Sequence, residues 1–249
     1  MTSDAVLTEV VDEVLVVTLN RPEVRNAIDS DLALGVRAAF DELDHRDDLR
    51  VGVLTGAAGT FCSGMDLKAF ARHGRPRGSQ VLLREGARKP LVAAIEGFAL
   101  GGGFELALVA DILVMAEDAL VGLPETRVGL FPSGGALHRL PAVLPRPVVA
   151  ELAFTGDRMG AERAHHFGLV SRVTPPGKAL PEALDIAAGI ARSAPLGVGA
   201  VKELLRTGPG ADDFWVRQRE LAETVFNSGD AREGATAFAE RRDPRWRNR

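Results

Sequence analysis

The hydrophobic and polar positions of the first 116 residues alternate between two periods. Two runs rich in β-branched residues, VLTEVVD and residues 14–20, are separated by Asp12-Glu13, a pattern that predicts a β-hairpin. Short apolar runs at residues 51–56, 91–98 and 109–116 are typical of strands buried on both faces. Parallel strands need long crossover connections, so the pattern predicts an α/β fold with a parallel sheet.

Stretches with helical spacing lie between these apolar runs. Apolar residues recur with a helical period through residues 32–43, and Ser30 or Asp31 is placed to cap that helix. The basic, glycine-bearing residues 72–89 are instead typical of a solvated and mobile stretch.

The last third of the chain has a helical character. Six helical patterns, punctuated by Gly and Pro, lie at residues 146–155, 160–167, 178–192, 196–206, 212–227 and 230–240. We therefore expect an α/β core over residues 1–190 and a helical C-terminal region of the same domain over residues 191–249.

Composition excludes several classes of partner. The 249 residues are 46% hydrophobic and 26% charged with a net charge of −4, which offers no basic field for nucleic acid. The single cysteine, Cys62, excludes an internal disulfide framework and a multi-thiolate metal site, and the histidines are interpreted as surface or cap residues, so no metal is expected. The first residues have no signal-peptide pattern and no apolar stretch has the length of a membrane span, which predicts a cytoplasmic protein without membrane contact.

Three consecutive glycines, Gly101 to Gly103, precede an apolar helical stretch that opens with a carboxylate, Glu105. A glycine-rich turn that leads into a helix exposes free backbone N–H groups, which favour negative charge. The dinucleotide fingerprint would need a glycine where Leu106 stands, and the Gly-Lys-Ser/Thr of a phosphate-binding loop and the G-x-S-x-G of a serine hydrolase are absent. The remaining use is an oxyanion hole.

A second loop of the same design lies upstream. Its residues Ser63, Gly64, Met65 and Asp66 precede a helical pattern that begins at Leu67, so two loops can supply two N–H donors to one oxygen. A carbonyl polarised in this way activates the carbons next to it for proton transfer or addition, chemistry that uses carboxylates. Glu105 follows the glycine run, and Glu125 lies in a loop shaped by Gly and Pro around a short helix.

Six motifs carry a family resemblance across nearly the whole chain. They are LNRPEVRNAID, TGAAGTFCSGMDLKAF, GFALGGGFELALVADILV, LPETRVGLFPSGGALHRL, TGDRMGAERAHHFGLVSRV and FAERRDP. In order and spacing they resemble the crotonase, or enoyl-CoA hydratase/isomerase, superfamily. The resemblance implies a crotonase-like spiral of ββα units with a helical C-terminal oligomerisation region. It also implies an acyl-CoA thioester substrate and no separate cofactor, since CoA is part of the substrate.

The same resemblance implies roles for four residues. The amides of Met65 and Gly102 match the oxyanion hole for the thioester oxygen, and Glu105 and Glu125 match the two glutamates of the hydratases. These enzymes add water across the alpha-beta double bond of a 2-enoyl-CoA, with one carboxylate as base and the other as acid. Either glutamate can take either role at this point.

CoA contacts and assembly follow from the resemblance too. Matching positions around the CoA are Val24, Arg25, Ser63, Gly64, Asp66 and Leu67, with Phe238 and Arg241 approaching the CoA of a neighbouring subunit. The family assembles as homotrimers or as homohexamers built from two trimers.

Alternative substrates and functions stay open. The segment between Asp66 and Gly102, where the family shapes its acyl pocket, is shorter than in the mitochondrial-type hydratases, which leaves the acyl-chain length open. Several motifs most resemble the carnitinyl-CoA dehydratase branch. A cationic acyl group would need an aromatic or acidic partner, and the chain has no tyrosine and only Trp215 and Trp246. A double-bond isomerase would need one glutamate, and a non-catalytic acyl-CoA binder would need neither.

Overall fold

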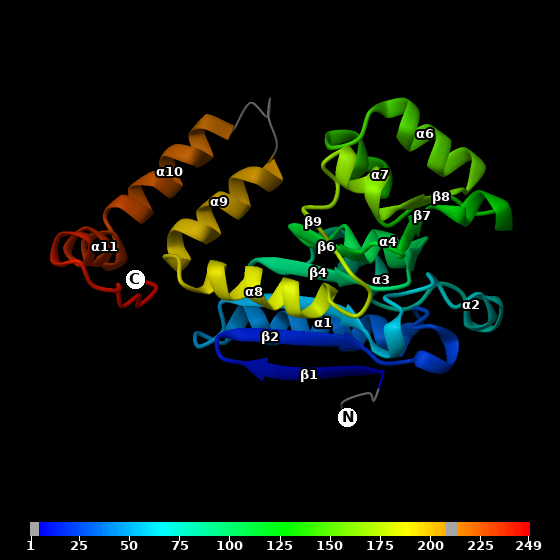
Figure 1. The fold of residues 1–249 in the computed structure, drawn as a ribbon, viewed down its shortest axis with the longest axis horizontal. Helices are drawn as coiled ribbons and strands as arrows, with labels where there is room; N and C mark the ends of the chain where they lie inside the picture. The colour runs from blue at the N-terminus through cyan, green and yellow to red at the C-terminus, as the bar shows by residue number, and fades with distance from the viewer. Residues whose placement is uncertain (1–4, 208–213) are drawn as a thin grey trace.

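The computed structural model describes residues 5–207 and 214–249, and its core is a parallel sheet with helices on both faces (Figure 1). The sheet has the order β1-β2-β3-β4-β6-β9, in which β1 and β2 are antiparallel and the other neighbours are parallel. Its strands are β1 (Val6–Val11), β2 (Val14–Leu19), β3 (Val51–Gly56), β4 (Leu91–Ile95), β6 (Ile112–Ala116) and β9 (Arg172–Thr174). The predicted hairpin and parallel strands are confirmed.

A second, smaller sheet positions the three consecutive glycines, Gly101 to Gly103. It has the order β5-β7-β8 and consists of β5 (Phe98–Leu100), β7 (Leu120–Gly122) and β8 (Arg158–Gly160). The helix α4 (Gly102–Ala107) begins two residues after β5 ends. The Gly101 N–H donates to the carbonyl of Gly122 at 2.9 Å, so the sheet holds the start of the run in place.

Two helices cover opposite faces of the main sheet (Figure 1). On α8 (Ala179–Ala191), four alanines at every fourth position are buried against strand residues such as Val53 and Val92. The helix α1 (Ser30–His45) buries its apolar stripe against the other face, where Leu54 points. Neighbouring residues of a strand thus pack into different hydrophobic cores, because successive side chains of a strand point to opposite faces of the sheet.

The cap of α1 differs from the predicted one. Asp29 is the capping residue, with extended backbone angles and a side chain that accepts from Leu32 N–H at 2.9 Å. Ser30 is already helical, and its Oγ accepts instead from Arg77 N–H at 3.0 Å. The predicted cap at Ser30 or Asp31 is therefore wrong.

Short helices connect the strands. They are α2 (Leu67–His73), α3 (Ser79–Glu85), α5 (Ala136–Arg139), α6 (Arg146–Thr155), α7 (Ala161–His166) and the 3-10 turns η1 (Pro22–Val24), η2 (Ala57–Gly59), η3 (Pro124–Val128) and η4 (Leu140–Ala142). The helix α3 corrects the expectation for residues 72–89, because Leu82 and Leu83 are buried in the core. The apolar pair gives the segment a hydrophobic anchor despite its basic composition.

Three helices form the C-terminal region, as predicted: α9 (Pro195–Thr207), α10 (Phe214–Phe226) and α11 (Gly229–Glu240). Lys202 fastens α9 to the core, since its buried ammonium donates to the Lys89 carbonyl at 2.8 Å and to Asp111 at 2.7 Å. Figure 1 shows α10 and α11 standing away from the sheet. Large apolar side chains are exposed here, with Leu205 at 76% and Phe226 at 80%.

Within residues 5–207 and 214–249, no single helix is long and apolar enough to cross a membrane. Residues Ala179–Ala191 and Pro195–Arg206 reach that length and composition only as a pair bent by 114°.

Candidate active site

A cavity of about 280 Å³ brings together four of the residues that the sequence singled out. Met65, Gly102, Glu105 and Glu125 all line it, although they come from separate segments of the chain. Its apolar walls include Ile28, Phe70, Leu83, Leu130 and Phe131.

The loop that carries Met65 is held on both sides by backbone hydrogen bonds. On one side Cys62 N–H donates to Phe98 of β5 at 2.8 Å, and on the other Ile28 N–H donates to the Gly64 carbonyl at 2.8 Å. Asp66 N–H in turn donates to Ile28 at 2.9 Å. These bonds fix the amide of Met65 between two anchored neighbours.

The Met65 and Gly102 amides lie close to each other. A Cβ built on Gly102 would lie 3.8 Å from Met65 N, and one built on Gly64 would lie 3.7 Å from Gly102 N. Neither amide donates to a backbone or side-chain acceptor among the described residues. Two neighbouring N–H groups without an internal acceptor can serve as an oxyanion hole.

Glu105 is oriented by the loop between η3 and α5. The residue is 4% exposed, and its Oε1 accepts from Gly134 N–H at 2.7 Å and from Ala136 N–H at 3.2 Å. Burial raises the pKa of Glu105 above its ordinary value, while these two N–H groups act in the opposite direction. One carboxylate oxygen is thus fixed, which leaves Oε2 as the oxygen available for chemistry.

The loop is itself tied down by Arg139. Its guanidinium donates to the Gly134 carbonyl at 3.2 Å and to the Leu83 carbonyl of α3 at 2.7 Å. The positive charge of Arg139 also favours the ionised form of Glu105. Sequence reasoning did not single out Arg139, although it lies within the quoted motif LPETRVGLFPSGGALHRL.

Glu125 has a different environment. Both of its carboxylate oxygens are buried and have no hydrogen-bond partner among the described residues. Burial, helped by the charge of nearby Glu105, raises the pKa of Glu125 to about 7. Its carboxyl is therefore partly protonated at neutral pH, and the two glutamates have unequal proton affinities.

Glycines allow both carboxylates to approach the backbone closely. A Cβ on Gly101, whose φ is +55°, would lie 3.3 Å from Glu125 Oε1. A Cβ on Gly134 would lie 2.6 Å from Glu105 Oε2. The glycines near the site thus make room for the carboxylates as well as exposing amides.

The raised pKa of Glu125 predicts a pH-dependent stability. The pKa of the carboxyl is 4.5 in the unfolded state and about 7 in the folded state, so the unfolded state loses its proton first. The cost of burying the carboxyl therefore grows as pH rises from about 4.5 and levels off above about 7. Glu125→Gln should therefore gain about 1–2 kcal/mol relative to wild type between pH 5 and pH 8, after allowance for partial solvent screening. Thermal unfolding of both proteins at the two pH values measures this, with the exposed Glu162→Gln as control. Equal pH dependence in the variant and wild type would contradict it.

The residues predicted to border CoA lie in or next to the loop that carries Met65, and they do not line the cavity. Ser63 Oγ donates to the Val24 carbonyl at 3.3 Å, and Ser63 N–H donates to the Arg25 carbonyl at 3.0 Å. Arg25 is exposed and has a left-handed backbone, with φ at +55°. Leu67, at 45% exposure, begins α2 on the same side of the loop.

Asp66 has a structural role that the sequence analysis did not predict. Its carboxylate caps α2 by accepting from Ala69 N–H at 3.0 Å, and it lies 3.3 Å from the guanidinium of Arg21. The hydrogen bond from Ala69 N–H contributes most to lowering the pKa of Asp66, and the interaction with Arg21 lowers this pKa further. Arg21 also lies 3.1 Å from Asp29, so one arginine joins the caps of α1 and α2.

Phe238 and Arg241 lie far from these residues in the single chain. Phe238 falls within α11, and its side chain lies outside the described part, while Arg241 follows that helix and is exposed. Figure 1 shows α11 at the opposite end of the molecule from α2. A contact with CoA would require a neighbouring subunit, and this role stays a prediction.

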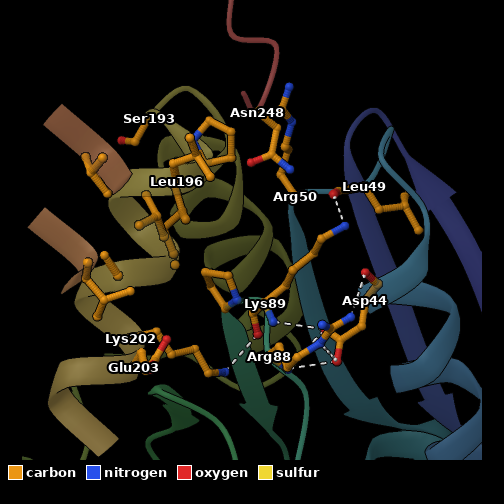
Figure 2. A pocket seen from close by; sticks show the side chains of 18 of the residues that line it. Asp44, Leu49, Arg50, Arg88, Lys89, Ser193, Leu196, Lys202, Glu203 and Asn248 are labelled. Carbon is orange, nitrogen blue, oxygen red and sulfur yellow. Dashed lines mark hydrogen bonds and ion pairs between the residues drawn. The ribbon is translucent and has the colours of Figure 1, made fainter. Parts of the chain in front are cut away.

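A larger cavity of about 680 Å³ lies where the C-terminal helices meet the core (Figure 2). Some of the charged groups that line this cavity are already hydrogen-bonded within the protein. Lys89 Nζ donates to the carbonyls of Leu43, Arg46 and Leu49 at 2.8, 2.6 and 2.9 Å. It adjoins Arg50 and Pro90, which precede β3 and β4, at the amino ends of the parallel strands. The smaller cavity lies beyond the carboxyl ends, where ligands bind in parallel sheets.

Among residues 5–207 and 214–249, no group of three or more His, Cys, Asp and Glu side chains is arranged to hold a metal ion. Cys62 is buried, and desolvation raises the pKa of its thiol to about 12. Two backbone amides and two carboxyls are the groups of the smaller cavity that match the predicted chemistry.

Comparison with known proteins agrees with this arrangement. The family model described as Enoyl-CoA hydratase/isomerase matches residues 9–249. Carnitinyl-CoA dehydratase from Escherichia coli (strain K12) is 42% identical over 252 residues, which cover 95% of each protein. An enoyl-CoA hydratase structure from Mycobacterium tuberculosis H37Rv has 45% identity and a TM-score of 0.93, covering 99% of this chain and 100% of that one. One from Bacillus anthracis has 31% identity and a TM-score of 0.92, covering 98% and 100%.

These solved structures confirm the predicted crotonase-like fold and its helical C-terminal region. Both the family model and the Mycobacterium tuberculosis structure cover the three glycines, the segments that carry the two glutamates and the C-terminal helices. The chain therefore belongs to the enoyl-CoA hydratase/isomerase family of enzymes, the crotonases.

Proposed function

We propose that the protein is an enoyl-CoA hydratase, which reversibly adds water across the alpha-beta double bond of a 2-enoyl-CoA thioester. The observation that carries the proposal is the meeting of two free amides, from Met65 and Gly102, with two carboxyls in one cavity. An isomerase needs one carboxyl and a binder needs none, so the buried pair favours hydration. Family membership supports the same reaction class.

In the proposed mechanism the thioester oxygen accepts hydrogen bonds from the Met65 and Gly102 amides. Negative charge that develops on this oxygen during addition is stabilised by donors that are already in place. The CoA part of the bound substrate extends from the oxyanion hole toward Val24 and Arg25, because these residues contact Ser63 and do not line the cavity. The acyl chain then enters the cavity.

The environments of the two glutamates divide the labour. Glu105, whose ionised form is favoured by two N–H donors and by Arg139, takes a proton from water while the water oxygen bonds to the beta carbon. Glu125, with a pKa of about 7, gives its proton to the alpha carbon. Proton exchange with solvent restores both groups before the next turnover.

The test is a spectroscopic assay with crotonyl-CoA and purified protein. Loss of the conjugated thioester absorbance is expected, with kcat/KM falling as pH rises through about 7, because Glu125 then loses the proton that it must donate. Folded protein that binds the thioester without any loss of absorbance would overturn the proposal. A profile that rises through the same range would overturn the assignment of Glu125 as the acid.

Self-association is part of the proposal. Exposed apolar side chains on α9 and α10, including Leu205 and Phe226, support a contact between copies of the chain. The predicted homotrimer or homohexamer would cover them and bring Arg241 to a neighbouring subunit.

A further inference from the structure

The cavity that receives the acyl chain has a second polar region apart from the glutamates. Arg75, Ser79 and Gln80 line it, and all three come from the connection between α2 and α3 or from the start of α3. The described lining contains three ionisable side chains, which are Arg75, Glu105 and Glu125. Since the glutamates work on the reacting carbons in the proposed function, Arg75 is the charge left for the rest of the acyl group.

The helix α3 sets the spacing between the two polar regions. Leu83 and the Glu105 carboxylate meet at Gly134, where an added Cβ would lie 2.5 Å from Leu83 Cδ1 and 2.6 Å from Glu105 Oε2. Ser79 lies four residues before Leu83, on the same helix face and about 6 Å along the axis. Arg75 precedes the helix in the chain and lines the same cavity. The lining therefore joins the reacting end, apolar Leu83 and, before the start of α3, a residue with a guanidinium.

The guanidinium of Arg75 is available to bind a ligand. It is exposed and makes no ion pair or hydrogen bond with the residues that the structure describes. A guanidinium binds a carboxylate through two parallel hydrogen bonds, and nearby amide and hydroxyl groups can complete such a site. A trimethylammonium group at the same place would meet a like charge instead.

We propose that the preferred substrate is a 2-enoyl-CoA whose acyl chain ends in a carboxylate, the mono-CoA thioester of an unsaturated dicarboxylic acid, and that Arg75 is its specificity-determining residue. The inference rests on the proposed hydratase function and narrows its substrate class. The proposal also separates this chain from its carnitinyl-CoA dehydratase relatives, whose name denotes a cationic acyl group.

Position argues against the CoA phosphates as the partner of Arg75. The residues expected around CoA, Val24, Arg25 and Ser63, do not line this cavity, whereas the oxyanion amides of Met65 and Gly102 do. The cavity is thus on the acyl side of the thioester. Apolar Phe70 and Phe131 line it as well and suit the methylene groups between the double bond and a terminal carboxylate.

The test compares kcat/KM for glutaconyl-CoA, 2-hexenedioyl-CoA, crotonyl-CoA and crotonobetainyl-CoA in wild type, Arg75→Gln and Arg77→Gln. At least one dicarboxylic thioester should be hydrated faster than crotonyl-CoA, and crotonobetainyl-CoA should be slowest. Arg75→Gln should lower kcat/KM for that dicarboxylic substrate by about 10- to 100-fold, the scale of a hydrogen-bonded charge pair. Crotonyl-CoA should change by less than about threefold, as for a surface substitution.

Arg77→Gln is the matched control, because Arg77 is exposed, lies two residues away and does not line the cavity. Equal losses for all substrates in Arg75→Gln would mean that Arg75 binds CoA, and this would overturn the inference. So would wild-type turnover of crotonyl-CoA without preference for either dicarboxylic thioester. Both results leave the hydratase function intact.

A binding measurement separates the inference from catalysis. Calorimetry with the saturated thioesters glutaryl-CoA and butyryl-CoA should give tighter binding of glutaryl-CoA, and Arg75→Gln should abolish the difference. This pattern without turnover of any enoyl-CoA would support the acyl-carboxylate site and overturn the hydratase function. Equal binding of both thioesters by wild type would overturn the site.

Discussion

Glu105→Gln and Glu125→Gln should each lower kcat for crotonyl-CoA hydration by about 10²- to 10⁴-fold, the range for loss of a general acid or base. Gln keeps the shape of the side chain and can neither take nor give the proton. Glu105→Gln should also weaken the orientation of the 134–136 loop, because a neutral amide oxygen accepts the Gly134 and Ala136 N–H groups less strongly than a carboxylate. The measurement is steady-state hydration by loss of thioester absorbance.

Glu162→Gln serves as the control, since this exposed glutamate on α7 lies outside the cavity. Its kcat should equal that of wild type. A near-normal kcat in one of the two active-site variants, with collapse in the other, would contradict the two-carboxylate mechanism and favour the isomerase. Binding of the thioester by both variants, measured by calorimetry, distinguishes lost chemistry from lost structure.

Gly64→Ala should lower kcat/KM by about 10²- to 10³-fold, as for removal of one oxyanion donor. Gly64 has φ at +105°, where an L side chain is strained, and an added Cβ would lie 2.8 Å from the Leu100 carbonyl. The loop would have to move, and the amide of Met65 would move with it. The loss should fall mainly on kcat, because the donors stabilise charge that develops during the reaction.

Gly59→Ala is the matched control for backbone strain. Gly59 also has a positive φ, at +69°, and its added Cβ would meet nothing within 4 Å. Both variants should lose stability, by about 1–3 kcal/mol each, and Gly64→Ala alone should lose catalysis. Hydration kinetics at a temperature below both unfolding transitions measure this. Near-wild-type kcat in folded Gly64→Ala would refute the assignment of the Met65 amide.

Local pattern predicted most of the fold, because each strand and helix carries its own period. The alanines at every fourth position of α8 indicate in the sequence which side of that helix is apolar. The continuous apolar runs of β3 and β4 indicate strands that are buried on both faces. The segment of α3 was predicted wrongly, because its buried Leu82 and Leu83 stand among basic residues and glycines. Their burial depends on partners distant in the chain.

The sequence by itself determined the chemical groups of the candidate site, since glycine runs before helices and two glutamates beside them are local features. Only the tertiary structure decided how these groups differ. Glu105 accepts hydrogen bonds from the amides of residues 134 and 136, whereas the carboxylate oxygens of Glu125 are buried with no partner among residues 5–207 and 214–249. This contrast separates the proton affinities of the two glutamates. The structure also placed Arg75 in the lining of the cavity that contains these carboxyls. Electrostatic environment and cavity lining arise from segments that meet only on folding, so no local pattern in the sequence encodes them.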